Sequence, residues 1–428
     1  MERAEPASPG VERRSLAMQV VVICVIGVGA GLAGMLLALL LHLIQHLAYG
    51  YSAGHIVSSE SFLAGVTGSD PTRRVLAMAA CGLIAGFGWW AIYRFGKPLV
   101  SVKRAVTSDQ DRMPGATTTA HALLQIVTVA LGSPLGREVA PREAGAVFAS
   151  WICDRAGITA GQRKIMIACG AGAGLAAVYN VPLGGTIFVL EVLLGTFAWS
   201  AVLPAMATSG IAAIVAWIGL GNESQYVVPT FDISASLVVW STLCGPLFGL
   251  AAYGFHEVTK WARDAAPKDW KLPVISIVNF MLIGVLAIWY PQLLGNGKGP
   301  AGLSFDDNLT IGLAATLLVL KVVITASSLR SGAQGGLLTP SLTNGALLAI
   351  VLGGLWNLIW PGTSLGAFAI VGAAAFLGSA MKMPLTAVVL ILEFTRVNHD
   401  FLIPILFSLG GSAMTFSLLD KRLAQPSA

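Results

Sequence analysis

A series of long apolar runs separated by short polar stretches constrains the fold of this chain more than any other feature. Such runs lie at about 16–48, 73–95, 201–220, 233–256 and 272–294, and others follow along the chain. A straight helical span of a bilayer needs about 20 apolar residues. Only 11% of the residues are charged, against roughly a quarter in soluble domains. The sequence therefore predicts an all-α polytopic membrane protein.

The same composition argues against several other functions. The basic residues lie at the ends of apolar runs and not in one patch, so the net charge of +5 does not indicate nucleic-acid binding. The five cysteines are scattered singly, without a CxxC pair, which indicates neither a metal site nor a disulfide framework. Phosphate-binding, zinc-protease and hydrolase motifs are absent, so we expect no enzyme and no cofactor.

An internal repeat divides the chain into two halves. The Pro-Leu pair at 182–183 recurs at 384–385, and the Leu-Glu pair at 190–191 recurs at 392–393, both after 202 residues. Two related halves place a binding site near the bilayer midplane, at the interface between them. The expected segments are a cytoplasmic N-terminal segment (1–15), a first membrane repeat (16–220), a loop (221–232), a second repeat (233–418) and a short tail (419–428).

The stretch from Gly132 to Gly145 interrupts two apolar runs with three glycines, two prolines and four charged residues. Within hydrocarbon, non-helical backbone is tolerated only where protein or water covers it. A looser match links this stretch to Gly335–Pro340, which is also Gly-rich, ends in Pro and precedes an apolar run. We expect these two to be corresponding broken segments that line a polar path.

The breaks have the features of an anion site. Pro98, Pro141 and Pro340 each stand where a helix could begin, and helix N-termini attract anions through unpaired N–H groups. Glu138 lies in this zone, where an ionisable residue is a functional candidate. Its carboxylate could occupy the anion site itself, and protonation would free the site. The alternative is a surface Glu138 paired with a neighbouring arginine, Arg137 or Arg142.

The residues at these breaks resemble the CLC family of chloride channels and proton/chloride exchangers, from about residue 16 to 418. Gly136-Arg137-Glu138 resembles the family's G-[KR]-E-G-P segment, and 336–340 resembles G-x-F-x-P. The resemblance implies inverted-topology repeats of tilted and broken helices, a homodimer, and a multi-pass protein of the cell membrane, here a bacterial inner membrane. It makes Glu138 the gating glutamate. The anion-binding residues that we expect are Gly136, Arg137, Val139, Gly336, Leu337, Leu338 and Lys97.

The chain also departs from this pattern. Lys97 falls where the family usually has an anion-coordinating serine, and Ser101 is too far along in register to replace it. Lys97 either supplies a fixed cation at the inner end of the pathway or is a cytosolic lysine in a shifted register. Val192 stands where many exchangers have an internal proton-transfer glutamate, and the family's C-terminal tyrosine is missing.

We therefore expect transport of an inorganic anion, chloride by default, through a glutamate-gated pathway. Two mechanisms stay open, namely proton-coupled antiport and a passive voltage- or pH-gated channel. A cation-coupled carrier of organic solutes is the alternative from another class, although it would need oxygen ligands that the apolar runs scarcely contain. The expected partners are inorganic anions, protons and the lipid bilayer.

Overall fold

The computed structural model describes residues 9–50, 61–108 and 111–424, which form seventeen α-helices and no strand longer than a single bridge. The expected terminal segments thus lie partly outside the described residues, at 1–8 and 425–428. The helices are α1 (Pro9–Tyr49), α2 (Phe62–Gly68), α3 (Pro71–Phe95), α4 (Val102–Thr107), α5 (Gly115–Ala130), α6 (Val139–Ala156), α7 (Ala160–Tyr179), α8 (Pro182–Phe188), α9 (Trp199–Leu220), α10 (Ala235–Asp264), α11 (Lys271–Trp289), α12 (Lys298–Phe305), α13 (Ile311–Arg330), α14 (Leu338–Trp356), α15 (Leu365–Ala380), α16 (Pro384–Thr395) and α17 (Leu402–Ala424).

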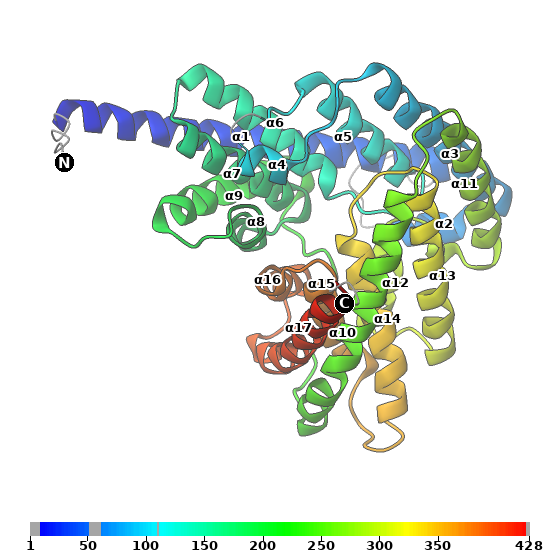
Figure 1. Cartoon of the computed structure of the whole chain (residues 1–428). Helices are drawn as coiled ribbons and strands as arrows, with labels where there is room; N and C mark the ends of the chain where they lie inside the picture. The colour runs from blue at the N-terminus through cyan, green and yellow to red at the C-terminus, as the bar shows by residue number, and fades with distance from the viewer. Residues whose placement is uncertain (1–8, 51–60, 109–110, 425–428) are drawn as a thin grey trace.

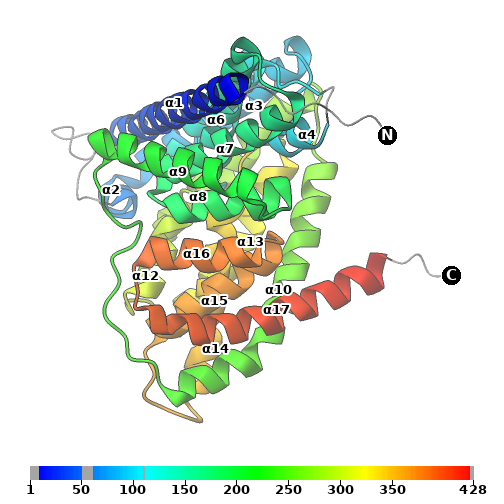
Figure 2. The same ribbon diagram turned by 90° about the vertical axis from the view of Figure 1, so that its left-hand side faces the viewer.

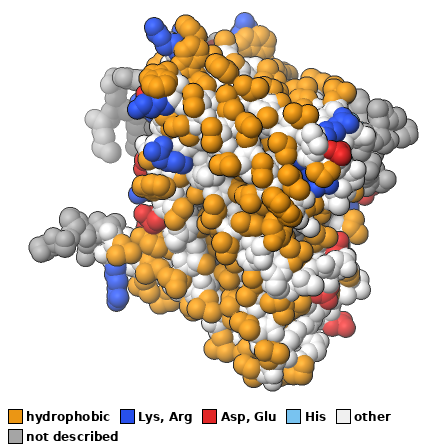
Figure 3. All heavy atoms as spheres, turned by 90° about the vertical axis from the view of Figure 1, so that its right-hand side faces the viewer, with side chains coloured by type: hydrophobic (Ala, Val, Ile, Leu, Met, Phe, Trp, Pro, Cys, Tyr) orange, Lys and Arg blue, Asp and Glu red, His pale blue; other side chains and the backbone are white. Residues whose placement is uncertain are grey.

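Eight helices of the described residues are long and apolar enough to cross a bilayer. They are α1, α3, α9, α10, α11, α13, α14 and the helical segment that contains α17. Hydrophobic side chains also cover most of the face seen in Figure 3. The chain is therefore an all-α polytopic membrane protein, as the sequence predicts. Several other apolar helices, among them α8, α15 and α16, are too short to span a bilayer alone.

The two halves of the chain repeat the same helix pairings. In the first half α1 packs on α9 and α6 packs on α7, and in the second half α10 packs on α17 and α14 packs on α15. Helices α1 to α9 form the upper part of the molecule in Figures 1 and 2, and most later helices lie below them. The non-helical stretch at 221–234 joins the halves. Helix α17 continues past the expected end of the second repeat, to Ala424.

A turn recurs in both halves immediately before each broken segment. The N–H of Ser133 donates to the Thr128 carbonyl at 3.0 Å, and the N–H of Ala333 donates to the Ser328 carbonyl at 3.1 Å. Gly132 and Gly332 have φ values of +110° and +95° in these turns, a region that L side chains rarely adopt. The halves thus reverse direction after α5 and α13 through the same glycine-dependent geometry.

Glu191 and Glu393 join the halves through reciprocal hydrogen bonds. The Glu393 carboxylate accepts from the N–H groups of Leu183 and Gly184 at 3.0 and 2.6 Å, at the start of α8. The Glu191 carboxylate accepts from Leu385 N–H at 2.9 Å and also from Thr386, at the start of α16. Each carboxylate thus satisfies unpaired N–H groups at the N-terminus of the other half's helix.

We expect Glu393→Ala to destabilise the protein, because it leaves two N–H groups at the start of α8 without their acceptor. A hydrogen bond to a charged group contributes about 1.5–3 kcal/mol, so we expect a loss of about that size and a lower unfolding temperature in detergent. The exposed Glu223 offers a control, since Glu223→Ala should leave the unfolding temperature unchanged. Equal unfolding temperatures for Glu393→Ala and the wild-type protein would contradict this assignment.

Candidate functional site

The two broken segments meet through a two-residue antiparallel bridge. The N–H of Gly136 donates to the Gly336 carbonyl at 2.8 Å, and the N–H of Gly336 donates to the Gly136 carbonyl at 2.9 Å. These backbone groups lie between helices of the two halves, α6 and α14, which begin just after the bridge. The structure therefore brings the two Gly-rich breaks together at the interface between the repeats, where the sequence predicts a binding site.

Glu138 lies at the centre of this junction. Its side chain is fully buried, and its Oε1 accepts a hydrogen bond of 2.7 Å from the N–H of Leu338. Its Oε2 is buried without a hydrogen-bond partner among the described residues. A methyl group on Gly136 or on Gly336 would overlap this carboxylate, so glycine at both positions makes room for it.

The arginines beside Glu138 do not form an ion pair with its carboxylate. The Nε of Arg142 donates to the main-chain carbonyl of Glu138 at 2.9 Å, and its guanidinium lies over the Phe188 ring at 5.0 Å from the centroid. The Arg137 guanidinium lies over the Tyr179 ring at 5.1 Å. Glu138 is thus not the surface glutamate of the alternative interpretation. Its carboxylate instead accepts from the first N–H group of α14, that of Leu338, where the helix dipole favours an anion.

The other expected anion-binding residues divide into two groups. Gly136, Arg137 and Val139 flank Glu138, while Gly336, Leu337 and Leu338 belong to the facing segment. Lys97 lies apart from them. Its side chain is exposed, its N–H donates to Thr117 Oγ1 at 3.2 Å, and it does not line the cavity below the site. This position matches the alternative of a lysine in a shifted register.

A cavity of about 700 Å³ extends from the broken segments to a basic surface. Val139, Gly336 and Leu337 line the end of the cavity next to Glu138. The charged groups of its wall are four cations and two carboxylates, namely Arg142, Lys260, Arg263, Lys382, Glu143 and Asp264. This excess of positive charge raises the local concentration of anions. Basic residues are characteristic of cytoplasmic ends, so we place the cavity on the cytoplasmic side.

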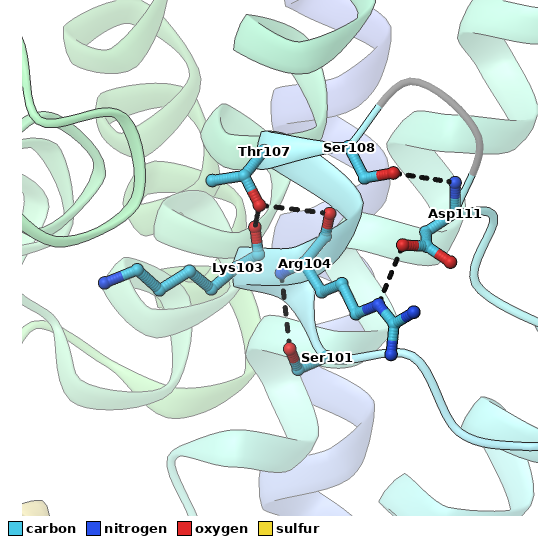
Figure 4. A network of polar contacts seen from close by, with 6 residues as sticks. All are labelled: Ser101, Lys103, Arg104, Thr107, Ser108 and Asp111. Carbon is cyan, nitrogen blue, oxygen red and sulfur yellow. Dashed lines mark hydrogen bonds and ion pairs between the residues drawn. The ribbon is translucent and has the colours of Figure 1, made fainter.

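Ser101 lines this cavity, in contrast to the expectation from its register. It caps α4, because its Oγ accepts from the N–H of Arg104 at 3.3 Å (Figure 4). Arg104 Nε in turn donates to Asp111 at 2.7 Å, and this guanidinium holds the pKa of the Asp111 carboxyl below its usual range. The contact joins the short helix to the chain beyond residue 110. The loop between α3 and α4 thus places Ser101 on the cavity wall and Lys97 outside it.

Two further polar residues of the cavity wall were missed from the sequence. Ser341, in the first turn of α14, is 0% exposed, and its hydroxyl has no hydrogen-bond partner among the described residues. Tyr93, near the end of α3, also lines the cavity. Both lie in apolar runs, where sequence alone cannot separate a hydroxyl that faces a path from one that bonds within its own helix. A helical register counted from Pro340 would have indicated Ser341.

Lys321 is buried in α13 and donates from Nζ to two carbonyls, those of Leu293 and Gly295, at 3.1 and 2.8 Å. A buried lysine could contribute positive potential along an ion path or pair with a carboxylate. Its two hydrogen bonds instead hold the loop that precedes α12. Asn296, in that loop, lies against Thr339 Oγ1 at 3.4 Å, so Lys321 supports the outer side of the site indirectly.

Comparison with known proteins decides the family. The profile of the family described as voltage gated chloride channel matches residues 81–417. The chain belongs to the voltage gated chloride channel (CLC) family. The H(+)/Cl(-) exchange transporter ClcA of Cronobacter sakazakii is 29% identical over an alignment of 289 positions, and the match covers 62% of this chain and 61% of that protein. The match thus spans less than two thirds of the length of this CLC relative.

Other CLC proteins match over more of the chain. The voltage-gated ClC-type chloride channel ClcB of Citrobacter koseri is 27% identical over 84% of this chain and 90% of its own. The structure of a slow cyanobacterial Cl-/H+ antiporter covers 96% of this chain and 99% of its own, with a TM-score of 0.79 and 18% identity. A CLC-type fluoride/proton antiporter covers 93% and 95%, with a TM-score of 0.66 and 19% identity. These likenesses show the CLC fold.

Proposed function

We propose that this protein transports an inorganic anion, chloride by default, across the membrane in exchange for protons, with Glu138 as the gate. The observation that carries the proposal is the seat of the Glu138 carboxylate between two glycine backbones, on the N–H of Leu338. A carboxylate and a small anion compete for the same N–H groups. Protonation removes the charge of Glu138, so the side chain can leave and an anion can enter.

The proposed anion-binding residues are Gly136, Arg137, Val139, Gly336, Leu337 and Leu338. Support comes from their convergence at one buried junction and from the cavity that leads to it. The names of the relatives in Cronobacter and Citrobacter, an exchange transporter and a channel, agree with anion transport. We further propose a homodimer in a bacterial inner membrane, with α8, α9, α16 and α17 as the shared face. These four helices lie together in Figure 2 and expose apolar side chains such as Leu183, Leu203 and Leu385.

The test is reconstitution of the purified protein in chloride-loaded liposomes. Two results together support antiport. Chloride efflux exceeds that of protein-free liposomes, and protons enter the liposomes although no proton gradient is imposed. Chloride efflux without proton movement would instead indicate the passive channel, for which Val192 in place of an internal glutamate is the supporting observation. Absence of chloride flux, or a strict requirement for a sodium gradient, would contradict the proposal.

We expect Ser341→Ala to weaken anion binding about tenfold. The buried Ser341 hydroxyl is unpaired among the described residues and lines the cavity next to Leu337, and a hydrogen bond to a charged group contributes about 1.5–3 kcal/mol. Calorimetric titration with chloride measures the affinity.

Lys97→Met is the matched comparison for Ser341→Ala. Because the Lys97 side chain is exposed and lies outside the cavity wall, we expect its affinity to equal that of the wild-type protein. A weaker affinity in Lys97→Met together with an unchanged affinity in Ser341→Ala would reverse both assignments and restore Lys97 as the inner cation.

A further inference from the structure

A second buried carboxylate lies on the gating helix, at Glu143 of α6. Its side chain is 8% exposed and lines the cavity below the site. It is the partner of two residues of α5, since its Oε2 lies 2.9 Å from His121 Nδ1 and 3.2 Å from Gln125 Nε2. Neither Glu143 nor His121 contributes to the anion contacts described above. A buried Glu–His pair on the wall of a transport pathway calls for an explanation.

The geometry of this cluster accommodates a proton on either member. Gln125 Nε2 lies 2.9 Å from His121 Nδ1 and 3.2 Å from Glu143 Oε2, so its N–H can donate to either atom. When the proton is on His121 Nδ1, the imidazole donates to the Glu143 carboxylate, and Gln125 also donates to that carboxylate. When the proton is on Glu143, its O–H donates to the single lone pair of Nδ1, and Gln125 donates to Glu143 Oε2. The amide thus holds the Glu143 carboxyl group in place in both states.

The cavity connects this cluster to the gate. Glu143 and His121 line the same cavity as Gly336, which lies against the Glu138 carboxylate. Glu143 comes five positions after Glu138, the N-cap of α6, which corresponds to about 7.5 Å along the helix axis. A cavity of about 700 Å³ has room for about twenty water molecules. Water in the cavity can therefore carry a proton from Glu143 as far as Gly336, against which the buried Glu138 carboxylate lies.

We propose that Glu143, with His121 and Gln125, is the internal proton-exchange site of this transporter. The proposal rests on the proposed proton-coupled function and names the residues that supply its protons from the cytoplasmic side. Glu143 releases its proton to cavity water, and the water relay delivers one proton to the Glu138 carboxylate. Glu138 becomes neutral and leaves its seat, while Glu143 becomes a carboxylate that accepts a hydrogen bond from Gln125 Nε2. Water at the cytoplasmic mouth then reprotonates Glu143.

The cavity wall also carries other charged and titratable groups. They are Arg142, His256, Lys260, Arg263, Asp264 and Lys382. Cations outnumber acids among these groups, which raises the local concentration of anions in the cavity. Asp264 is the other acid of this wall, although it is not part of the hydrogen-bonded cluster. It therefore provides a matched control.

The test measures chloride and proton fluxes together in liposomes that contain the wild-type protein or a variant. We expect Glu143→Gln to keep chloride flux and to lose proton movement at least tenfold, and Glu143→Asp to restore most of the proton movement. Asp264→Asn should keep the wild-type ratio of proton to chloride movement. His121→Phe, which removes the partner but leaves the acid, should slow proton movement and shift its dependence on internal pH.

Several outcomes would overturn the proposal. One is wild-type proton movement in Glu143→Gln, and another is an equal loss of proton movement in Asp264→Asn. Loss of both fluxes in Glu143→Gln and in Glu143→Asp would show that Glu143 serves the anion path or folding instead. If the wild-type protein moves chloride but no protons, the proton-exchange site is wrong and anion transport still holds. If the wild-type protein moves no chloride at all, the proposed function itself is wrong.

Discussion

Glu138→Gln is expected to transport chloride without moving protons. The amide has nearly the shape of the carboxylate but carries no charge, so it competes poorly with an anion for the Leu338 N–H, which Glu138 holds at 2.7 Å. It also cannot take up and release a proton at any working pH. Chloride and proton fluxes recorded from the same liposomes measure the effect, and we expect proton movement to fall to the level of protein-free liposomes.

The control for this variant is Glu223→Gln, which removes a carboxylate from an exposed position. We expect it to transport both ions as the wild-type protein does. Proton movement driven by a chloride gradient could persist in Glu138→Gln. That result would show that another group carries the proton through the junction, and Glu138 would then not be the gate.

Gly336→Ala is expected to have the second largest effect, through the same carboxylate. A methyl group on Gly336 would overlap Glu138 Oε1 and Cδ in the observed conformation. Overpacking of this kind typically costs about 1–3 kcal/mol, which reduces the population of the seated carboxylate by about five- to a hundredfold. We expect fewer protons to move per chloride ion, measured by the ratio of the two fluxes.

Two further variants isolate this effect from a general loss of stability. Gly312→Ala adds a methyl group where no other atom lies within 4 Å, and its flux ratio should be that of the wild-type protein. In the Glu138→Ala background, Gly336→Ala should change the flux ratio little, because the carboxylate that it displaces is absent. A full additional effect in the double variant would show that the methyl group blocks the path itself.

Much of the fold could be predicted because membrane helices and repeats leave strong signals in sequence. The apolar runs predict helices such as α9 and α11, and the 202-residue offset predicts the reciprocal positions of Glu191 and Glu393. Asn180 and Lys382, each two positions before a repeated proline, have left-handed φ values of 55° and 53°. These features depend on local sequence and on symmetry, which the printed residues contain.

The inner part of the site could not be predicted in the same way. The position of Lys97 depends on how the loop between α3 and α4 runs, and no repeat or periodic pattern fixes its register. Ser341 has only small and apolar residues beside it, and Glu143 directly follows Arg142. Neither pattern shows which side chain faces a cavity, because that depends on tertiary packing. Motif comparison identified Glu138, but only the contact between α5 and α6 shows that Glu143 has a histidine partner.

Crystals of Glu138→Gln grown with bromide test most directly whether the gating carboxylate and the anion share one seat. The predicted result is an anomalous bromide peak within hydrogen-bond distance of the Leu338 N–H, where Glu138 Oε1 now lies, and no such peak in wild-type crystals at the same pH. Two results would contradict a glutamate gate. One is a bromide ion at the Leu338 N–H in wild-type crystals while Glu138 still occupies its observed position. The other is a bromide peak in Glu138→Gln that lies only at other places.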